Sequence, residues 1–162
     1  MFKTTSSIAR AGIIAGLYVV LTLITFPIAS SEIQFRPSEG LTLLPLIFPE
    51  AIVGVFVGCV LSNLITGCVV LDIIFGGLIT LISAILTYFV GKLIKSTPLK
   101  IIIGGIFPVL LNAFLLPVIW YYAYYESSYI YVIQVVFLLV SQSISVYAVG
   151  TPTILLMNRL LK

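Results

Sequence analysis

Long apolar runs joined by short polar links dominate this sequence and restrict what it can fold into. The runs occupy about residues 8–29, 41–66, 73–90, 101–122 and 129–156. About 20 apolar residues in a helix cross the hydrocarbon core of a bilayer. Hydrophobic residues make up 61% of the 162 residues and charged residues 8%, and the mean hydropathy is +1.28; soluble domains are far more polar. We therefore expect an all-α integral membrane protein in which residues 1–162 form a single transmembrane domain.

The second run, 41–66, decides the number of crossings. Pro45 and Pro49 interrupt it, and Glu50 follows directly. Because proline removes a backbone donor and clashes with the preceding turn, a break near 48–50 is predicted. Two crossings in this run obey the positive-inside tendency, because Arg36 is then the only basic residue on the outer side. The basic residues that this arrangement places in the cytoplasm are Lys3, Arg10, Lys92, Lys95, Lys100, Arg159 and Lys162.

The sequence thus predicts a six-transmembrane-helix bundle with cytoplasmic N- and C-termini. Lys3 and Arg10 precede an apolar stretch that is too long for a typical signal peptide, so we expect a retained first helix. The second helix, about residues 38–48, is short. As an α-helix it would span roughly 16 Å, about half of the hydrocarbon core. A short helix with polar residues at its outer end predicts a cavity that opens to the outside.

Polar residues at that outer end are candidates for ligand recognition. Residues 32–39 place two acids, an arginine and an amide between two apolar segments. The topology puts five ionisable residues on the outer face, namely Glu32, Arg36, Glu39, Asp72 and Glu126. Each has a plainer explanation, because Glu39 and Asp72 could simply favour a helix N-terminus and Arg36 could pair at the surface.

Single amides in apolar helices need partners, so Asn63, Asn112, Gln134 and Gln142 are predicted to face the bundle interior. They could be interhelical contacts or ligand contacts, and the ligand reading favours the first three, which belong to the outer half. Trp120 belongs to an aromatic belt or stacks on a flat heterocycle. The candidate binding residues are Gln34, Arg36, Glu39, Asn63, Asp72, Asn112, Trp120 and Gln134.

Small residues recur at spacings of four on two helices, which allows close helix approach. The first helix carries Ala11, Gly12, Ala15 and Gly16, and the third carries Gly54, Gly58, Ser62 and Thr66, which we expect to pack internally.

Several classes of protein are excluded or disfavoured. Histidine is absent, and the two cysteines lack a second ligand pair, so we expect neither a metal site nor a cofactor. Catalytic motifs and a P-loop are missing, which argues against an enzyme and requires any transport energy to come from elsewhere. The basic residues lie at segment ends and form no patch for nucleic acid.

The central part of the chain resembles the QueT family of queuosine-precursor carriers, within the substrate-binding S components of energy-coupling factor (ECF) transporters. The likeness lies in the segment QFRPSEGLTLLP from Gln34 to Pro45, in Gly58, Cys59 and Asn63, and in the segment LDIIFG from Leu71 to Gly76. Ala11 and Ala15 also resemble the small-residue motif of such S components.

The resemblance implies capture of a 7-deazaguanine, such as queuine or its aminomethyl precursor, at the outer face of a bacterial cell membrane. A coupling membrane protein and two ATPases would drive uptake, and the Ala11/Ala15 side of the first helix, widened by Gly12 and Gly16, would dock on the coupling protein. Carboxylates suit the adjacent N–H donors of a guanine-like edge and a cationic amine. We therefore expect Glu39 or Asp72 at the ring edge and the other near the amine. Arg36 would hold Glu39 or the ligand carbonyl.

Three alternatives stay open. The same architecture could carry a vitamin or another purine-like cargo. The chain could also be an autonomous carrier. A third possibility is a membrane assembly factor that binds a protein and no small molecule.

Overall fold

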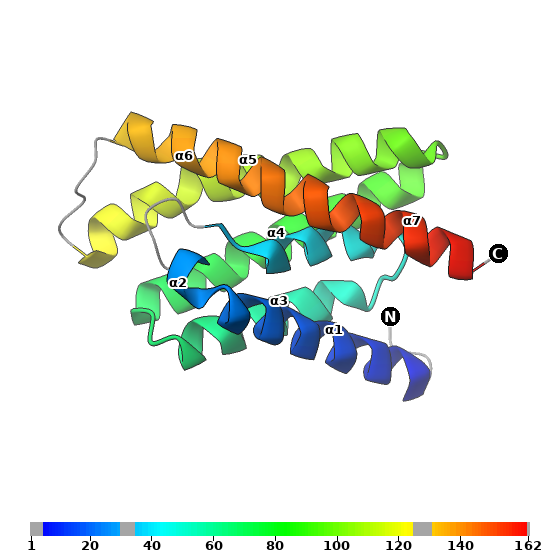
Figure 1. The fold of residues 1–162 in the computed structure, drawn as a ribbon, viewed down its shortest axis with the longest axis horizontal. Coiled ribbons are helices and arrows are strands. Elements are labelled where there is room, and N and C mark those ends of the chain that lie inside the picture. Colours follow the sequence, from blue (N-terminus) through cyan, green and yellow to red (C-terminus); the bar gives the residue numbers. More distant parts are fainter. Residues whose placement is uncertain (1–4, 30–34, 125–130, 162) are drawn as a thin grey trace.

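The computed structural model describes residues 5–29, 35–124 and 131–161, and all regular structure in these ranges is helical (Figure 1). The elements are α1 (Thr5–Ile24), α2 (Phe26–Ala29), the 3₁₀ helix η1 (Pro37–Leu46), α3 (Ala51–Ile65), α4 (Val70–Leu93), α5 (Thr97–Tyr124), α6 (Tyr131–Ile144), the π-helical segment η2 (Ser145–Val149) and α7 (Gly150–Leu160). The prediction of an all-α protein is confirmed.

Four helical stretches are long and apolar enough to cross a membrane. They are Thr5–Ile24, Val70–Leu93, Thr97–Tyr122 and Tyr131–Leu160, the last of which runs through α6, η2 and α7 as one rod. α3, at Ala51–Ile65, is apolar but shorter. Large apolar side chains such as Ile13, Ile102 and Val132 are exposed on these helices, as expected where lipid replaces water as the solvent.

The predicted break in the second run is confirmed, because a turn at residues 47–50 separates η1 from α3. The short second helix is also present, but it is a 3₁₀ helix and not the α-helix that we expected. At about 2.0 Å per residue, its 10 residues span about 20 Å. Pro45 lies inside this helix and cannot donate a backbone hydrogen bond there.

η1 runs through the centre of the bundle, and two glycines of neighbouring helices make room for it. A Cβ on Gly91 of α4 would lie 2.6 Å from the Leu46 carbonyl oxygen, and a Cβ on Gly150 of α7 would lie 2.6 Å from the Gly40 carbonyl oxygen. Every residue of η1 from Ser38 to Leu46 is buried. The helix is therefore enclosed by protein and carries its polar residues into the interior.

α1 packs against α3 through glycines of the predicted internal stripe. A Cβ on Gly54 would approach the Ala11 carbonyl oxygen to 2.9 Å, and one on Gly58 would approach Cβ of Tyr18 to 2.6 Å. Close backbone approach of this kind is a main source of helix association in lipid. The internal packing predicted for Gly54 and Gly58 is confirmed.

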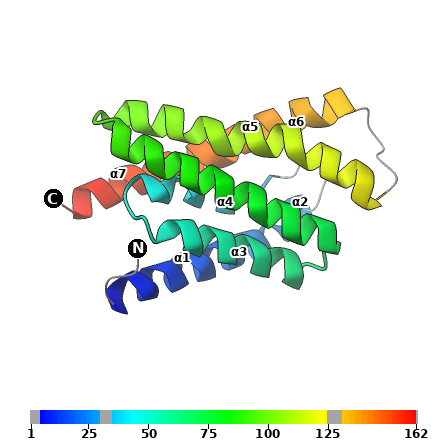
Figure 2. The same ribbon diagram turned by 180° about the vertical axis from the view of Figure 1, so that it is seen from behind.

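The start of α1 and the end of α7 lie at the same end of the molecule, together with the 47–50 turn and the α4–α5 connection (Figures 1 and 2). Arg10 of α1 forms an ion pair with the buried Glu50 and stacks its guanidinium over the Phe48 ring, 5.4 Å from the centroid. The α3–α4 turn, with Gly67 at φ +74°, lies at the opposite end. The ion pair fixes the break between η1 and α3 against the start of α1.

Candidate ligand-binding site

A cluster of polar side chains is buried where η1 meets α1, α3, α4, α5 and α6. Its members are each at most 8% exposed, in a bundle whose other core residues are mostly apolar. They are Tyr18, Arg36, Glu39, Asn63, Asp72, Asn112 and Gln142. Burying such groups is costly unless they are hydrogen-bonded, so a cluster of this size needs an explanation.

Glu39 is at the centre of one half of the cluster. The Tyr18 hydroxyl donates a hydrogen bond to Oε1 of Glu39, and Nδ2 of Asn112 donates to Oε2 at 3.3 Å. The same Asn112 nitrogen lies 3.3 Å from Oε1 of Gln142, to which it also donates. Both carboxylate oxygens of Glu39 are thus held by neutral donors from α1 and α5.

Arg36 and Asp72 belong to the other half. Nη2 of Arg36 donates to Oδ1 of Asn63, whose own Nδ2 donates to the backbone carbonyl of Asp72 at 3.4 Å. Nε1 of Trp120 donates to Oδ1 of Asp72 at 3.3 Å. Arg36 is therefore a buried donor to Asn63, where the sequence led us to expect a contact with Glu39 or a surface pair.

Two buried donors of the cluster have no hydrogen-bond partner among the described residues. They are Nε of Arg36 and Nε2 of Gln142. Unsatisfied buried donors are rare in proteins and commonly mark a place for a bound molecule or water. Together with the acceptor oxygens of Glu39 and Asp72, they give the cluster the capacity to recognise a polar molecule that has both acceptors and donors.

The structure brings together most of the predicted site residues. Arg36 and Asn63 are linked directly, Glu39 is linked to Asn112, and Asp72 to Trp120. Gln134 is buried on α6. Gln34 lies outside the described residues, as do Glu32 and Glu126. All four amides predicted to face the interior, Asn63, Asn112, Gln134 and Gln142, are buried, so that prediction is confirmed.

Two members of the cluster were missed as site residues. Gln142 was placed too deep in the membrane to count as a ligand contact, although it shares a hydrogen-bonding partner with Glu39. Tyr18 could have been found from spacing, because Ala11, Ile14, Ala15 and Tyr18 recur every three or four residues and form the buried side of α1.

The small residues of α1 divide between two sides of the helix. Ala11 and Ala15 are buried against α3, whereas a Cβ on Gly12 or Gly16 would meet nothing within 4 Å. Ala11 and Ala15, which we expected on the docking side, thus lie on the side of α1 that packs against α3, and docking at α1 stays a prediction. Gly12 and Gly16 lie on the open side.

The two cysteines are free thiols. Cys59 is buried and accepts a hydrogen bond from Thr80 at 3.3 Å, and burial raises the pKa of the Cys68 thiol in the α3–α4 turn. Across the described ranges, no group of three His, Cys, Asp or Glu side chains could hold a metal ion.

Comparison with known proteins decides the family. The sequence model described as "QueT transporter" matches residues 8–159. The chain belongs to the QueT transporter family. Membership in this family, with several long apolar helices, makes it a multi-pass membrane protein of a bacterial membrane and implies a non-enzymatic role.

A curated QueT relative has also been compared with the chain. Over 80 residues the chain is 39% identical to the "Queuosine precursor transporter QueT" of Lactococcus lactis subsp. cremoris strain MG1363. The match covers 48% of this chain and 47% of that protein, so it spans about half the length of the relative. No solved structure matches.

Proposed function

We propose that this QueT family member is the substrate-binding S component of an ECF-type importer and captures queuosine precursors of the 7-deazaguanine class. One observation carries the proposal: two carboxylates and an arginine are buried together inside an apolar bundle. A charged group in such surroundings is costly without a function or a partner. The printed name of the Lactococcus relative supports the choice of cargo.

The chemistry of the cluster suits a guanine-like ring. Adjacent N–H donors of the ring would bind a carboxylate, and Glu39 is held ready because Tyr18 and Asn112 fix its two oxygens. The unsatisfied donors of Arg36 and Gln142 suit the ring carbonyl. Asp72 would then lie near the cationic amine of an aminomethyl precursor.

The remaining candidates have supporting roles in this proposal. Asn63 orients Arg36 and Asn112 orients Glu39. Trp120 is partly buried with its N–H on Asp72, which leaves its ring for stacking. Gln134, and Gln34 outside the described residues, would add amide contacts.

We further propose six crossings with both termini in the cytoplasm, η1 and α3 being the second and third. Arg10, Lys92, Lys95, Lys100 and Arg159 belong to segments at the end of the molecule that holds the start of α1 and the end of α7 (Figure 1), in keeping with the positive-inside tendency.

A coupling membrane protein and two ATPases would complete the importer. The coupling protein would meet α1 on the open side that carries Gly12 and Gly16, because α3 covers Ala11 and Ala15. Small residues on an exposed helix side permit close approach of a partner helix.

The test is direct binding to the purified protein. Mass spectrometry should find a 7-deazaguanine retained from cells, and titration should give tighter binding of queuine or its aminomethyl precursor than of riboflavin, thiamine or guanine. Tighter binding of a vitamin would change the cargo and keep the architecture. Absence of any small-molecule binding would support the assembly-factor alternative, and uptake that persists without the ATPases would support an autonomous carrier.

A further inference from the structure

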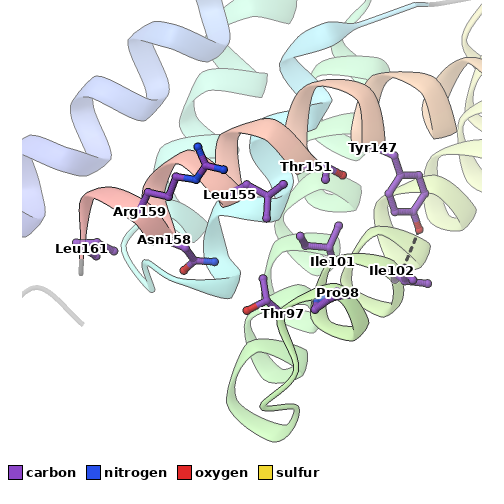
Figure 3. A pocket seen from close by; sticks show the side chains of 10 residues that line it. All are labelled: Thr97, Pro98, Ile101, Ile102, Tyr147, Thr151, Leu155, Asn158, Arg159 and Leu161. Carbon is purple, nitrogen blue, oxygen red and sulfur yellow. Dashed lines mark hydrogen bonds between the residues drawn. The ribbon is translucent and has the colours of Figure 1, made fainter.

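A groove far from the polar cluster lies between the start of α5 and α7 (Figure 3). Its cavity volume is about 800 Å³. In Figure 3 the side chains of Arg159, Asn158 and Thr97 lie toward one end and Tyr147 toward the other. The groove is separate from the proposed substrate site and shares no lining residue with it.

The groove mixes polar and apolar side chains. Thr97, Asn158 and Arg159 supply a hydroxyl, an amide and a guanidinium toward the end near Leu161, and Ile102, Leu155 and Thr151 line the stretch toward Tyr147. The Tyr147 hydroxyl is occupied, because it donates to the Ile102 carbonyl at 2.8 Å. Tyr147 and Arg159 are separated by about 18 Å of helix at 1.5 Å per residue, which compares with about 15 Å for half of a hydrocarbon core.

The charge at the polar end is not neutralised within the described part of the chain. The acids described there are Glu39 and Asp72, which belong to the central cluster, and Glu50, which pairs with Arg10. Arg159 therefore has no acidic partner in those ranges. Lys92, Lys95 and Lys100, from the α4–α5 region at the same end of the molecule, add to the positive potential.

We propose that this groove binds an anionic phospholipid. The phosphate contacts Arg159, Asn158 and Thr97, and an acyl chain lies along Ile102 and Leu155 toward Tyr147. Charge complementarity selects an anionic headgroup, since basic pockets between helices at a membrane surface bind such lipids. The uncompensated charge of Arg159 favours a lipid with an anionic headgroup over an apolar partner helix.

Native mass spectrometry of the delipidated full-length protein tests the proposal, with phosphatidylglycerol and phosphatidylcholine of identical acyl chains added in equal amounts. The wild-type protein should retain phosphatidylglycerol in preference to phosphatidylcholine. Arg159→Gln should reduce that preference about fivefold, the effect of one cation near an anionic lipid. Lys92→Gln is the matched control, because it removes one cation at the same end without touching the groove, and it should lower the preference by clearly less than Arg159→Gln does.

A second variant tests the acyl-chain part of the groove. Leu155 is exposed, so Leu155→Trp should fold while filling the groove, and it should reduce retention of both lipids. Equal retention of the two lipids by the wild-type protein would overturn the proposal, as would equal losses in Arg159→Gln and Lys92→Gln. Displacement of the lipid by inorganic phosphate alone would show an anion site without a lipid. If Leu155→Trp kept lipid binding but blocked assembly with the coupling protein, the groove would be a protein interface.

Discussion

Charged residues occupy two regions of this molecule that differ in what surrounds them. In the centre, Arg36, Glu39 and Asp72 are buried and bonded to neutral side chains. At the end that holds the start of α1 and the end of α7 (Figure 1), Lys92 and Arg159 are exposed on the last turns of α4 and α7, and Lys95 is exposed in the α4–α5 connection. A charge is expensive to bury and cheap to expose, so the central charges must be fixed by specific hydrogen bonds. The peripheral charges act through their sign and their position. Substitutions of the central charges should therefore cause larger losses of ligand affinity and stability than substitutions of the peripheral ones.

The largest effect is expected at the central carboxylates. Glu39→Ala and Asp72→Ala should each weaken deazaguanine binding at least about 30-fold, the cost of losing ~2 kcal/mol or more from a buried charged contact. Calorimetric titration of the purified variants measures this. Arg159→Gln is a control at the other region and should bind the deazaguanine as the wild type does. If both carboxylate variants kept wild-type affinity, the central cluster would not be the substrate site.

A smaller effect is expected for Tyr18→Phe, which removes a donor to Glu39. Hydrogen bonds to charged groups contribute about 1.5–3 kcal/mol, against about 1 kcal/mol for neutral ones. Tyr147→Phe is the matched control, because Tyr147 donates to a neutral backbone carbonyl. Denaturant unfolding in detergent should show a larger loss of unfolding free energy for Tyr18→Phe than for Tyr147→Phe. Equal losses would mean that Glu39 does not depend on this donor.

Arg10→Gln should lower the free energy of unfolding by about 1 kcal/mol. This effect lies between those expected for the central and the peripheral residues. Arg10 is 46% exposed but its partner Glu50 is buried, and glutamine can still donate one neutral hydrogen bond in place of the ion pair. The free energy of unfolding at low and high salt measures this, and the difference between wild type and variant should shrink at high salt. If the loss of unfolding free energy did not change with salt, the Arg10–Glu50 pair would behave like the buried central charges.

The smallest effect is expected for Lys92→Gln. Its ammonium lies 5.5 Å from the centroid of the Tyr88 ring, and such exposed cation–π contacts contribute about 0.5–1 kcal/mol. The free energy of unfolding should fall by no more than this amount, and the affinity for the deazaguanine should stay the same. A loss of ligand affinity would contradict the division into two regions.

Much of the helical layout followed from local chemistry. Pro49 and Glu50 marked the break after η1, and the glycine spacing on α3 marked the side of that helix that packs internally. The 3₁₀ form of η1 did not follow, nor did the close approach of α4 and α7 to it at Gly91 and Gly150. The polar residue types of the site were readable, since amides and acids stand out in apolar runs. Their pairing was not, because Arg36 and Asn63 are far apart in sequence and meet only after α3 packs beside η1.

The sequence by itself determined that this chain is a membrane-embedded helical protein and which few polar residues could recognise a ligand. Apolar length and proline position are local properties, so they act before any helix has packed. Tertiary structure decided that Tyr18 and Gln142 join the cluster, that Asn63 receives the Arg36 hydrogen bond, and that α3 covers Ala11 and Ala15 while Gly12 and Gly16 stay open. These outcomes depend on the rotation and depth of each helix against its neighbours, which periodicity alone leaves undetermined.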